Sequence, residues 1–133
     1  YKIRVTGAFI IGFDYYTHKD YLRLIGFLIR SGLDLVSLTM LTPFPGSPLY
    51  EQLKKEDRIT TYDWRRYDGL QHVVFRPQRM SALSLQLWFV VIRMISLAAS
   101  PYFIKTELLV GFIYFICYRL AFYAADLIKN RFF

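Results

Sequence analysis

The chain has 133 residues, which is long enough for one domain with a packed core and too short for two domains of ordinary size. Its 17 Lys and Arg residues outnumber its 10 Asp and Glu residues, giving a net charge of +7. This balance suits anionic partners such as phosphates, nucleic acid or a bilayer surface, without choosing among them. The one cysteine, Cys117, excludes an internal disulfide and any multi-thiolate metal site within the chain.

The first predicted element is a strand over residues 3–11, which are mostly β-branched and apolar, as in a strand buried on both faces. Thr17 and Asp20 form a Thr-x-x-Asp capping box, which predicts that a helix begins there. Ser31-Gly32 is expected to end that helix, because glycine accepts the left-handed conformation that follows many helices. The apolar stripe facing the core is Tyr21, Leu24, Ile25 and Leu28.

A second strand is predicted over residues 33–41, followed by a turn rich in proline. Ser47 is a natural N-cap and Pro48 a natural first helical residue, so a helix is expected over residues 48–56. Two successive βα units predict a parallel pair of strands, and ligands of such sheets lie in the loops at the carboxyl ends of the strands. The loop after the second strand is thus either ligand-facing or a rigid connector.

The second half of the chain is predicted to be mainly helical. Residues 57–69 read as a loop or short helical turn, and His72–Phe75 as a short third strand. Only seven charged side chains fall within residues 80–133, where Ser100-Pro101 separates two helical candidates, about 82–99 and 102–129. These helices would span a membrane, lie on its surface, or pack against other parts of a larger protein; the sequence leaves the three open.

Motifs for common chemistries are sparse. The chain has no phosphate-binding glycine loop, and His18 and His72 lack neighbours at metal-ligand spacing. Asp63 and Asp68 form either an acid/base pair or, more simply, turn and capping residues. Residues 62–67 (YDWRRY) interleave two arginines with three aromatic side chains, as nucleic-acid-binding surfaces do.

Several stretches considered together resemble a known family. The chain resembles the C-terminal half of radical S-adenosylmethionine (SAM) enzymes, specifically those that carry an N-terminal cobalamin-binding domain. The matching stretches occur in the same order along the chain as in that family. The resemblance covers roughly residues 3–85. It rests on Gly7–Thr17 (GAFIIGFDYYT), Leu41–Leu53 (LTPFPGSPLYEQL), Arg58-Ile59, Asp63-Trp64, Tyr67-Asp68, His72–Pro77 (HVVFRP) and Met80-Ser81.

The resemblance implies an α/β fold in which residues 1–80 form the last βα units of a partial, TIM-like (β/α)6 radical SAM barrel. Residues 81–133 would form an α-helical, strongly apolar extension. In the family, a Cys-x3-Cys-x2-Cys loop holds a 4Fe–4S cluster, and SAM bound to that cluster is cleaved to a 5′-deoxyadenosyl radical. Those cysteines are absent from this sequence. The chain is therefore expected to be inactive alone and to need a preceding part of the same polypeptide.

The family's fifth strand carries a Gly-x-Ile-x-Gly-x-x-Glu-like motif that shelves the adenine of SAM. Ile10 and Gly12 match its isoleucine and second glycine, whereas Ala8 and Tyr15 stand in place of its first glycine and its glutamate. The end of the next strand should offer backbone polar groups to the adenine edge. The cofactor-binding residues implied by the resemblance are Ile10, Gly12, Phe13, Asp14, Leu41 and Thr42; it implies no catalytic residue and no metal ligand in this chain.

The leading hypothesis is a fragment of a radical SAM enzyme of the cobalamin-binding class, methyltransferase- or cyclase-like, acting on an apolar lipid-like or tetrapyrrole substrate. The expected cofactors are SAM and the 4Fe–4S cluster, with cobalamin as a further candidate. The expected location is cytoplasmic, with peripheral membrane contact through residues 81–133 and no nucleic-acid partner. The rival hypotheses are a membrane-associated, non-enzymatic helical module and a nucleic-acid-binding domain.

Overall fold

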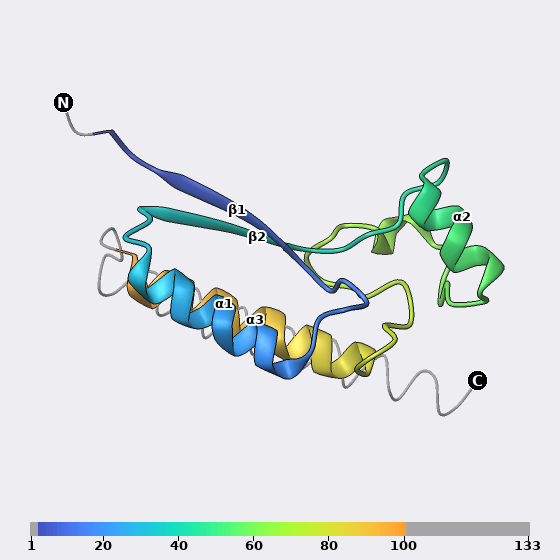
Figure 1. Ribbon diagram of the computed structural model, residues 1–133. Coiled ribbons are helices and arrows are strands. Elements are labelled where there is room, and N and C mark those ends of the chain that lie inside the picture. The colour runs from blue at the N-terminus through green and yellow to red at the C-terminus, as the bar shows by residue number, and fades with distance from the viewer. Residues whose placement is uncertain (1–2, 101–133) are drawn as a thin grey trace, which may run out of the picture. The chain divides into compact units, whose positions relative to one another are not determined.

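Two strands and two helices alternate over the first 55 residues, and a third helix follows later in the chain. The computed structural model describes residues 3–100, which belong to one compact unit. Figure 1 shows the elements in the chain order β1 (Thr6–Ile11), α1 (His18–Arg30), β2 (Leu35–Met40), α2 (Pro48–Lys55), a 3₁₀ turn (Trp64–Arg66) and α3 (Ala82–Ala99). The α/β alternation predicted from the sequence is confirmed for the described residues.

Local capping explains where the helices begin. The Asp20 carboxylate accepts hydrogen bonds from the backbone N–H (2.9 Å) and the hydroxyl (2.7 Å) of Thr17, the N-cap of α1. The hydroxyls of Ser47 and Ser81 accept the third backbone N–H of α2 and α3, at 3.2 and 3.1 Å. Each side chain satisfies N–H groups that the first helical turn leaves unpaired. All three predicted helix starts are confirmed.

The strands pair in parallel, as expected for consecutive βα units. Thr6 lies opposite Leu35 and the register ends with Ile11 opposite Met40. Because side chains alternate along a strand, this register places two different sets of residues on the two faces of the sheet.

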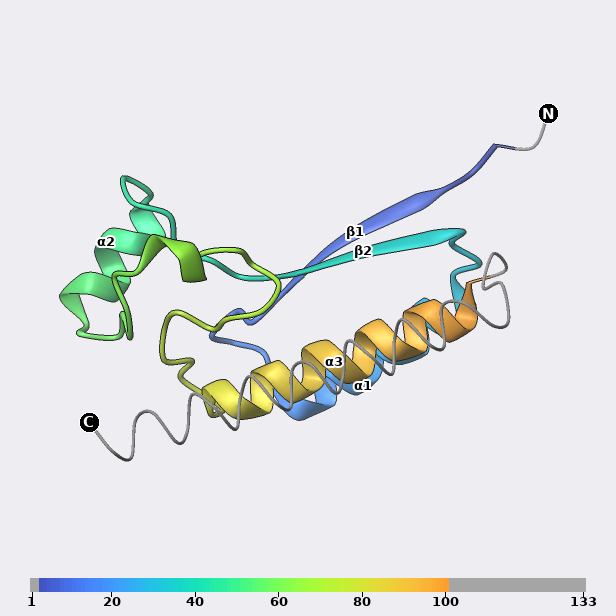
Figure 2. The same cartoon turned by 180° about the vertical axis from the view of Figure 1, so that it is seen from behind.

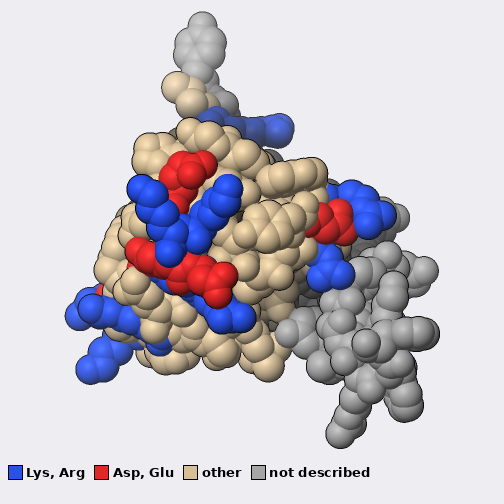
Figure 3. All heavy atoms as spheres, turned by 90° about the vertical axis from the view of Figure 1, so that its right-hand side faces the viewer, with Lys and Arg blue, Asp and Glu red and all other residues tan. Residues whose placement is uncertain are grey.

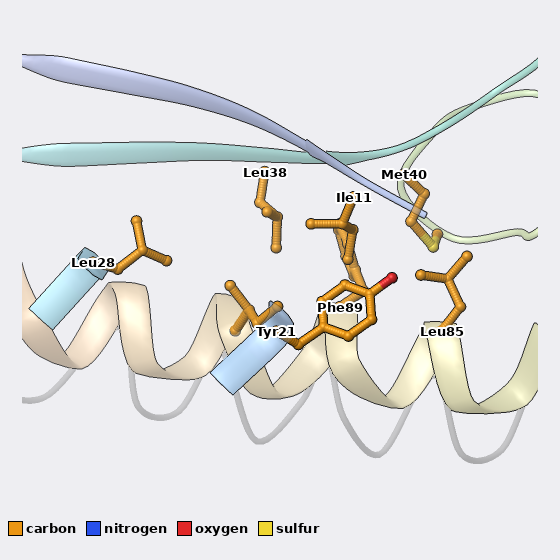
Figure 4. Packing of buried hydrophobic residues seen from close by; sticks show 8 residues of the cluster. Ile11, Tyr21, Leu28, Leu38, Met40, Leu85 and Phe89 are labelled. Atoms are coloured by element: carbon orange, nitrogen blue, oxygen red, sulfur yellow. The ribbon is translucent and has the colours of Figure 1, made fainter. Parts of the chain in front are cut away.

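One face of the sheet carries the core. Helices α1 and α3 lie side by side along this face (Figures 1 and 2). The side chains that fill the space between the layers come from both strands and both helices (Figure 4). They are Ile11, Tyr21, Leu28, Leu38, Met40, Leu85, Phe89 and Ile92. The predicted α1 stripe is confirmed, because Leu24 and Ile25 also pack against this cluster.

The other face of the sheet has no covering layer among residues 3–100. Figure 1 shows α1 and α3 on one side of the strands only. The side chains on the uncovered face are small or half-exposed: Thr6, Ala8, Ile10, Leu35, Ser37 and Thr39. Parallel sheets are normally covered on both faces, so this face is an incomplete surface for a sheet of this type.

The two outer edges of the sheet differ. The backbone N–H of Met40, which points away from β1, donates to the Gly69 carbonyl at 2.6 Å. Gly69 has φ +66°, and a side chain there would meet the Thr42 hydroxyl and the Met40 carbonyl. Among residues 3–100, no strand pairs with the outer edge of either β1 or β2. The outer edge of β2 is capped at Met40, near its carboxyl end.

The prediction of a third strand at His72–Phe75 is wrong. Only an isolated antiparallel bridge forms there, between Phe75 and Ile59. The Asp68 carboxylate accepts the N–H groups of Leu70 and Gln71, at 2.9 and 2.8 Å, and bends the preceding chain into a turn. Pro77 then removes a donor on the other side. The short helical turn expected within residues 57–69 is confirmed by the 3₁₀ turn.

Helix α3 spans the predicted residues 82–99 and ends at Ser100, whose hydroxyl donates to the Asp34 carbonyl at 2.7 Å. Within the described part of the chain it is the one helix long and apolar enough, by length and composition, to cross a membrane. A mostly buried core helix passes the same test; α3 contributes Leu85, Phe89 and Ile92 to the core, and 22% of its apolar window is buried. The predicted helix over 102–129 and Cys117 lie outside the described residues.

Candidate functional site

The predicted site residues lie where the two parallel strands end. Gly12 and Phe13 follow β1 directly, and Leu41 and Thr42 follow β2. Because the register pairs Ile11 with Met40, these two short segments are neighbours at one end of the sheet. Ligands of parallel α/β sheets bind at this end of the strands.

Gly12 occupies a position that no other residue would fit without strain. Its φ is +102°, a left-handed conformation that residues with a side chain rarely adopt. A Cβ atom built on Gly12 would also lie 2.9 Å from Leu85 Cδ2. The chain therefore needs glycine here to bring its backbone close to the core and turn into the following loop.

Ile10 lies on the uncovered face, opposite Thr39 in the register, and its side chain is 50% exposed. The Leu41 N–H donates to the Ile11 carbonyl at 2.7 Å, and the Thr42 hydroxyl donates to the Met40 carbonyl at 3.1 Å. An apolar shelf thus lies beside a strand end whose polar groups are partly used within the protein.

Asp14 is turned toward the protein. Its carboxylate forms a bidentate ion pair with Arg58, which is 44 residues away in the sequence. It also accepts the Gln78 N–H at 3.2 Å. The hydrogen bond from Arg58 lowers the pKa of Asp14, against partial burial, which raises it. The predicted cofactor role of this residue stays a prediction, but both carboxylate oxygens already have partners.

Sequence reasoning missed two features around this loop. The first is the Arg58 contact, which no local pattern signals. The second is a group of rings in which Phe13 stacks on Tyr15 (5.5 Å between centroids) and Tyr15 meets Tyr16 edge-on (4.9 Å). Tyr15 is 63% exposed. The run of aromatic residues on either side of Asp14 was a readable signal for this group.

The acid/base pair considered for Asp63 and Asp68 has a structural explanation. The Asp63 carboxylate caps the 3₁₀ turn by accepting the Arg65 N–H at 3.2 Å, and Asp68 organises the turn described above. Among residues 3–100, no group of three or more His, Cys, Asp or Glu side chains could hold a metal ion.

The aromatic and basic segment 62–67 does not present all of its groups to solvent. The guanidinium of Arg65 forms two 2.9 Å contacts with the Asp63 carboxylate, and Tyr67 is buried, with its hydroxyl donating to the Thr61 carbonyl. On the face seen in Figure 3, acidic and basic side chains are intermixed in small groups. That face has no continuous basic stripe of the kind that tracks a phosphate backbone.

A shallow, mostly apolar pocket of about 280 Å³ lies between the start of α1 and α3. Its lining includes His18 and Trp88, whose indole N–H donates to His18 Nδ1 at 2.7 Å. His18 is therefore a helix-pairing residue in this structure.

Comparison with known proteins finds that the chain is similar to methyltransferases. The chain is 34% identical over 85 residues to bacteriochlorophyllide d C-12(1)-methyltransferase of Chlorobaculum tepidum, covering 64% of the chain and 18% of that enzyme. It is 26% identical over 84 residues to the bacteriochlorophyllide d C-8(2)-methyltransferase of the same organism, covering 63% and 18%. An uncharacterized methyltransferase of Pyrococcus horikoshii is 30% identical over 87 residues, covering 62% and 19%.

The chain spans about a fifth of the length of these relatives. No family model matches the chain, and no solved structure matches it significantly. The matches to methyltransferases are consistent with the radical SAM resemblance and indicate an enzyme family.

Proposed function

We propose that this chain is the C-terminal part of a radical SAM methyltransferase of the cobalamin-binding class, with a tetrapyrrole as substrate. The observation that supports this most directly is the uncovered sheet face, which leads to the strand ends after Ile11 and Met40. The relatives named for bacteriochlorophyllide support the tetrapyrrole, a flat and largely apolar ring system.

The residues at the strand ends fit the adenine of SAM. Gly12 has a positive φ and no side chain, so a flat base can approach its backbone closely. Ile10 offers a half-exposed apolar surface on the adjoining face. Leu41 and Thr42 would contribute backbone polar groups beyond the two bonds they already make. These residues would bind and orient the cofactor and exclude water from one side of it.

The iron–sulfur cluster would be held outside the described residues, since these contain no group of metal ligands. When bound, the cluster supplies the electron for the reductive cleavage of SAM. The role of this chain is then to form one wall of the site opposite the cluster. Cobalamin would likewise be bound by a preceding domain.

The sheet supports a missing N-terminal partner. Parallel strands need neighbours and cover on both faces, and two strands alone are marginal. Because Gly69 caps the end of β2, a further strand would pair with the outer edge of β1. The matched relatives are about five times longer than the matched region, which leaves ample chain for such strands.

Exposed aromatic side chains favour a flat substrate. Tyr15, in the loop after β1, and Phe44, in the loop after β2, are 63% and 58% exposed. Aromatic rings stack on planar ring systems at a gain of about 0.5–1.5 kcal/mol per pair beyond burial of area. We assign both loops to the substrate side of the site.

The test uses the full-length protein with its cluster reconstituted and cobalamin supplied, under anaerobic conditions. We expect it to bind SAM and, with a reductant, to release 5′-deoxyadenosine and methylate a bacteriochlorophyllide, detected by mass spectrometry. Ile10→Asp should weaken SAM binding strongly, because it places a charge on the adenine shelf. Thr6→Asp, on the same exposed face at the other end of β1, is the matched control. A wild-type protein that binds no SAM would refute the proposal.

A second candidate function rests on α3. The side chains Leu83, Leu87, Val91 and Met94 recur every three or four residues and are 39–58% exposed, so they form one apolar stripe. We infer that a cytoplasmic protein of this kind would touch a membrane surface through residues 81–133. Co-sedimentation with anionic liposomes should fall in a Leu87→Glu, Val91→Glu variant; equal sedimentation of both proteins would count against this contact.

A further inference from the structure

Asp14 and Arg58 form a contact that the proposed function has not used. We propose that Asp14 is a positioning residue: held by Arg58 and the Gln78 backbone, it fixes the Gly12–Phe13 backbone in the conformation that receives SAM. This inference rests on the proposed function. It replaces direct contact between the Asp14 carboxylate and the cofactor with an indirect role.

Arg58 is held on every side of its guanidinium. Its two terminal nitrogens bind the Asp14 carboxylate, and one of them also binds Glu56 at 2.8 Å. Its Nε donates to the Arg76 carbonyl at 2.8 Å, and the Arg76 N–H returns a 2.8 Å bond to the Arg58 carbonyl. The Arg58 side chain is only 11% exposed. A guanidinium fixed in this way is a rigid support, since its planar donors match a carboxylate in one geometry.

Both carboxylate oxygens of Asp14 are already bound within the protein. Oδ1 accepts from Arg58 and from the Gln78 N–H, and Oδ2 accepts from Arg58. Three of the roughly four acceptor positions of the carboxylate are therefore used, which leaves one, on Oδ2, for a further donor. The arrangement therefore favours a support for the loop over a ligand contact.

The support acts at the middle of a short loop that is anchored at both ends. Gly12 leaves β1 with φ +102°, the Tyr16 N–H closes a turn onto the Phe13 carbonyl at 3.0 Å, and Thr17 enters the capping box of α1. Asp14 is the residue in between, and it joins this loop to residues 56–58 and 76–78. Removing its partner would release the segment next to the adenine shelf.

Comparison with another ion pair separates this role from ordinary surface charge. Asp63 and Arg65 also form a bidentate pair, but Arg65 is 90% exposed and lies two residues from its partner. Exposed pairs of this kind add little to stability. They provide a matched control with the same chemistry and no connection to the strand ends.

The experiment measures SAM affinity by calorimetry and amide hydrogen exchange in the reconstituted full-length protein, well below its unfolding temperature. The clamp variants change the Asp14–Arg58 ion pair, here called the clamp: they are Asp14→Asn, Arg58→Lys and the double variant. Asp63→Asn and Arg65→Lys are the controls. We expect each clamp variant to weaken SAM binding on the order of tenfold, as loss of a supporting contact does elsewhere. The double variant should lose little more, because the two residues act together. Amides 12–16 should exchange faster in all three.

The outcomes are distinct. If Asp14 binds SAM directly, Asp14→Asn weakens binding while Arg58→Lys does not, and the inference is overturned. It is also overturned if the clamp variants bind SAM like the wild type, or if the control variants lose as much affinity. If the wild-type protein binds no SAM, the proposed function fails and this inference fails with it. Hydrogen exchange then still reports whether the clamp orders the loop.

Discussion

The layered part of the molecule and the segment that follows β2 bury two separate sets of side chains. In the layered part, β1 pairs with β2 and α3 packs on both α1 and β2, through apolar side chains. Helix α2 takes no part in these extensive contacts. Residues 41–78 bury apolar side chains that do not belong to the cluster of the layered part, and Arg58 and backbone bonds also hold the segment; these side chains are Pro43, Tyr50, Leu53, Tyr67, Val74 and Phe75. Apolar packing therefore stabilises both regions, whereas the long-range ion pair of Arg58 with Asp14 acts on a strand-end loop.

The largest effect should come from the apolar layer. Phe89 is completely buried between α3 and the sheet (Figure 4), so Phe89→Ala should lower the free energy of unfolding by about 3–5 kcal/mol. Urea unfolding of the full-length protein would measure it. Phe44→Ala, at a side chain that is 58% exposed, is the control and should change little. Equal losses in both variants would remove the contrast between the two regions.

Gly12 lies where the two regions meet. Gly12→Ala should cost about 1–3 kcal/mol, from the positive φ and from contact with Leu85. Gly46 also has a positive φ (+80°), but its added Cβ would meet no atom within 4 Å. Gly46→Ala should therefore cost less, because only the backbone strain is added. A Gly46 variant that is the less stable of the two would show that close packing at Gly12 is unimportant.

Tyr21 is a defect within the apolar layer. Its hydroxyl is fully buried and makes no well-formed hydrogen bond with the described residues; a weak interaction with the Gly12 backbone N–H lowers its pKa, against the larger effect of burial. Because an unpaired buried hydroxyl is costly, Tyr21→Phe should stabilise the protein by about 1 kcal/mol. Thermal unfolding near neutral pH would show this. A destabilised variant would mean that the hydroxyl has a partner in solution.

The same residue has a consequence at high pH. Burial raises the pKa of Tyr21 to about 12, above its ordinary value of 10.0. A raised pKa means that folding favours the neutral form of Tyr21. The contribution of this shift to the free energy of unfolding is present below pH 10 and is lost as the pH rises toward 12. Tyr21→Phe should therefore unfold less steeply with alkali than the wild type; parallel alkaline curves would contradict this.

The smallest effect should be the acid response of the Asp14–Arg58 pair. Its hydrogen bond with Arg58 keeps the pKa of Asp14 below 3.8, so the pair contributes stability above that pH and loses it as the pH falls through the lowered value. Between about pH 5 and pH 2, the free energy of unfolding should fall less steeply in Asp14→Asn than in the wild type. Acid denaturation followed at several pH values would measure this. Identical slopes would show that the pair is equally formed in the unfolded chain.

Short-range patterns were enough to predict most of the fold. Thr17, Ser47 and Ser81 lie within three residues of the groups to which they are hydrogen-bonded, so the local sequence around each is enough to predict where a helix begins. The periodic stripe of α1 and the β-branched residues of the strands predicted the layer they form, because burial follows spacing.

Long-range contacts were the part that could not be predicted. His72–Phe75 has the composition of a strand, but the turn at Asp68 precedes it and, among residues 3–100, it forms only one bridge, between Phe75 and Ile59. Asp14 and Arg58 are far apart in sequence, and only the folded chain brings them together. The positions of Gly12, Phe13, Leu41 and Thr42 at one end of the sheet followed from topology, whereas the orientation of Asp14 did not.

The carbonyl of Gly69 on the last backbone amide of β2 also bears on self-association. Bare strand margins are templates on which copies of a protein stack into aggregates, and natural sheets blunt them. Among residues 3–100, this bond closes the outer edge of β2 at its carboxyl end only, and neither outer edge has a partner strand. A preceding strand paired with β1, as proposed above, would also remove an edge on which a second copy could add a strand.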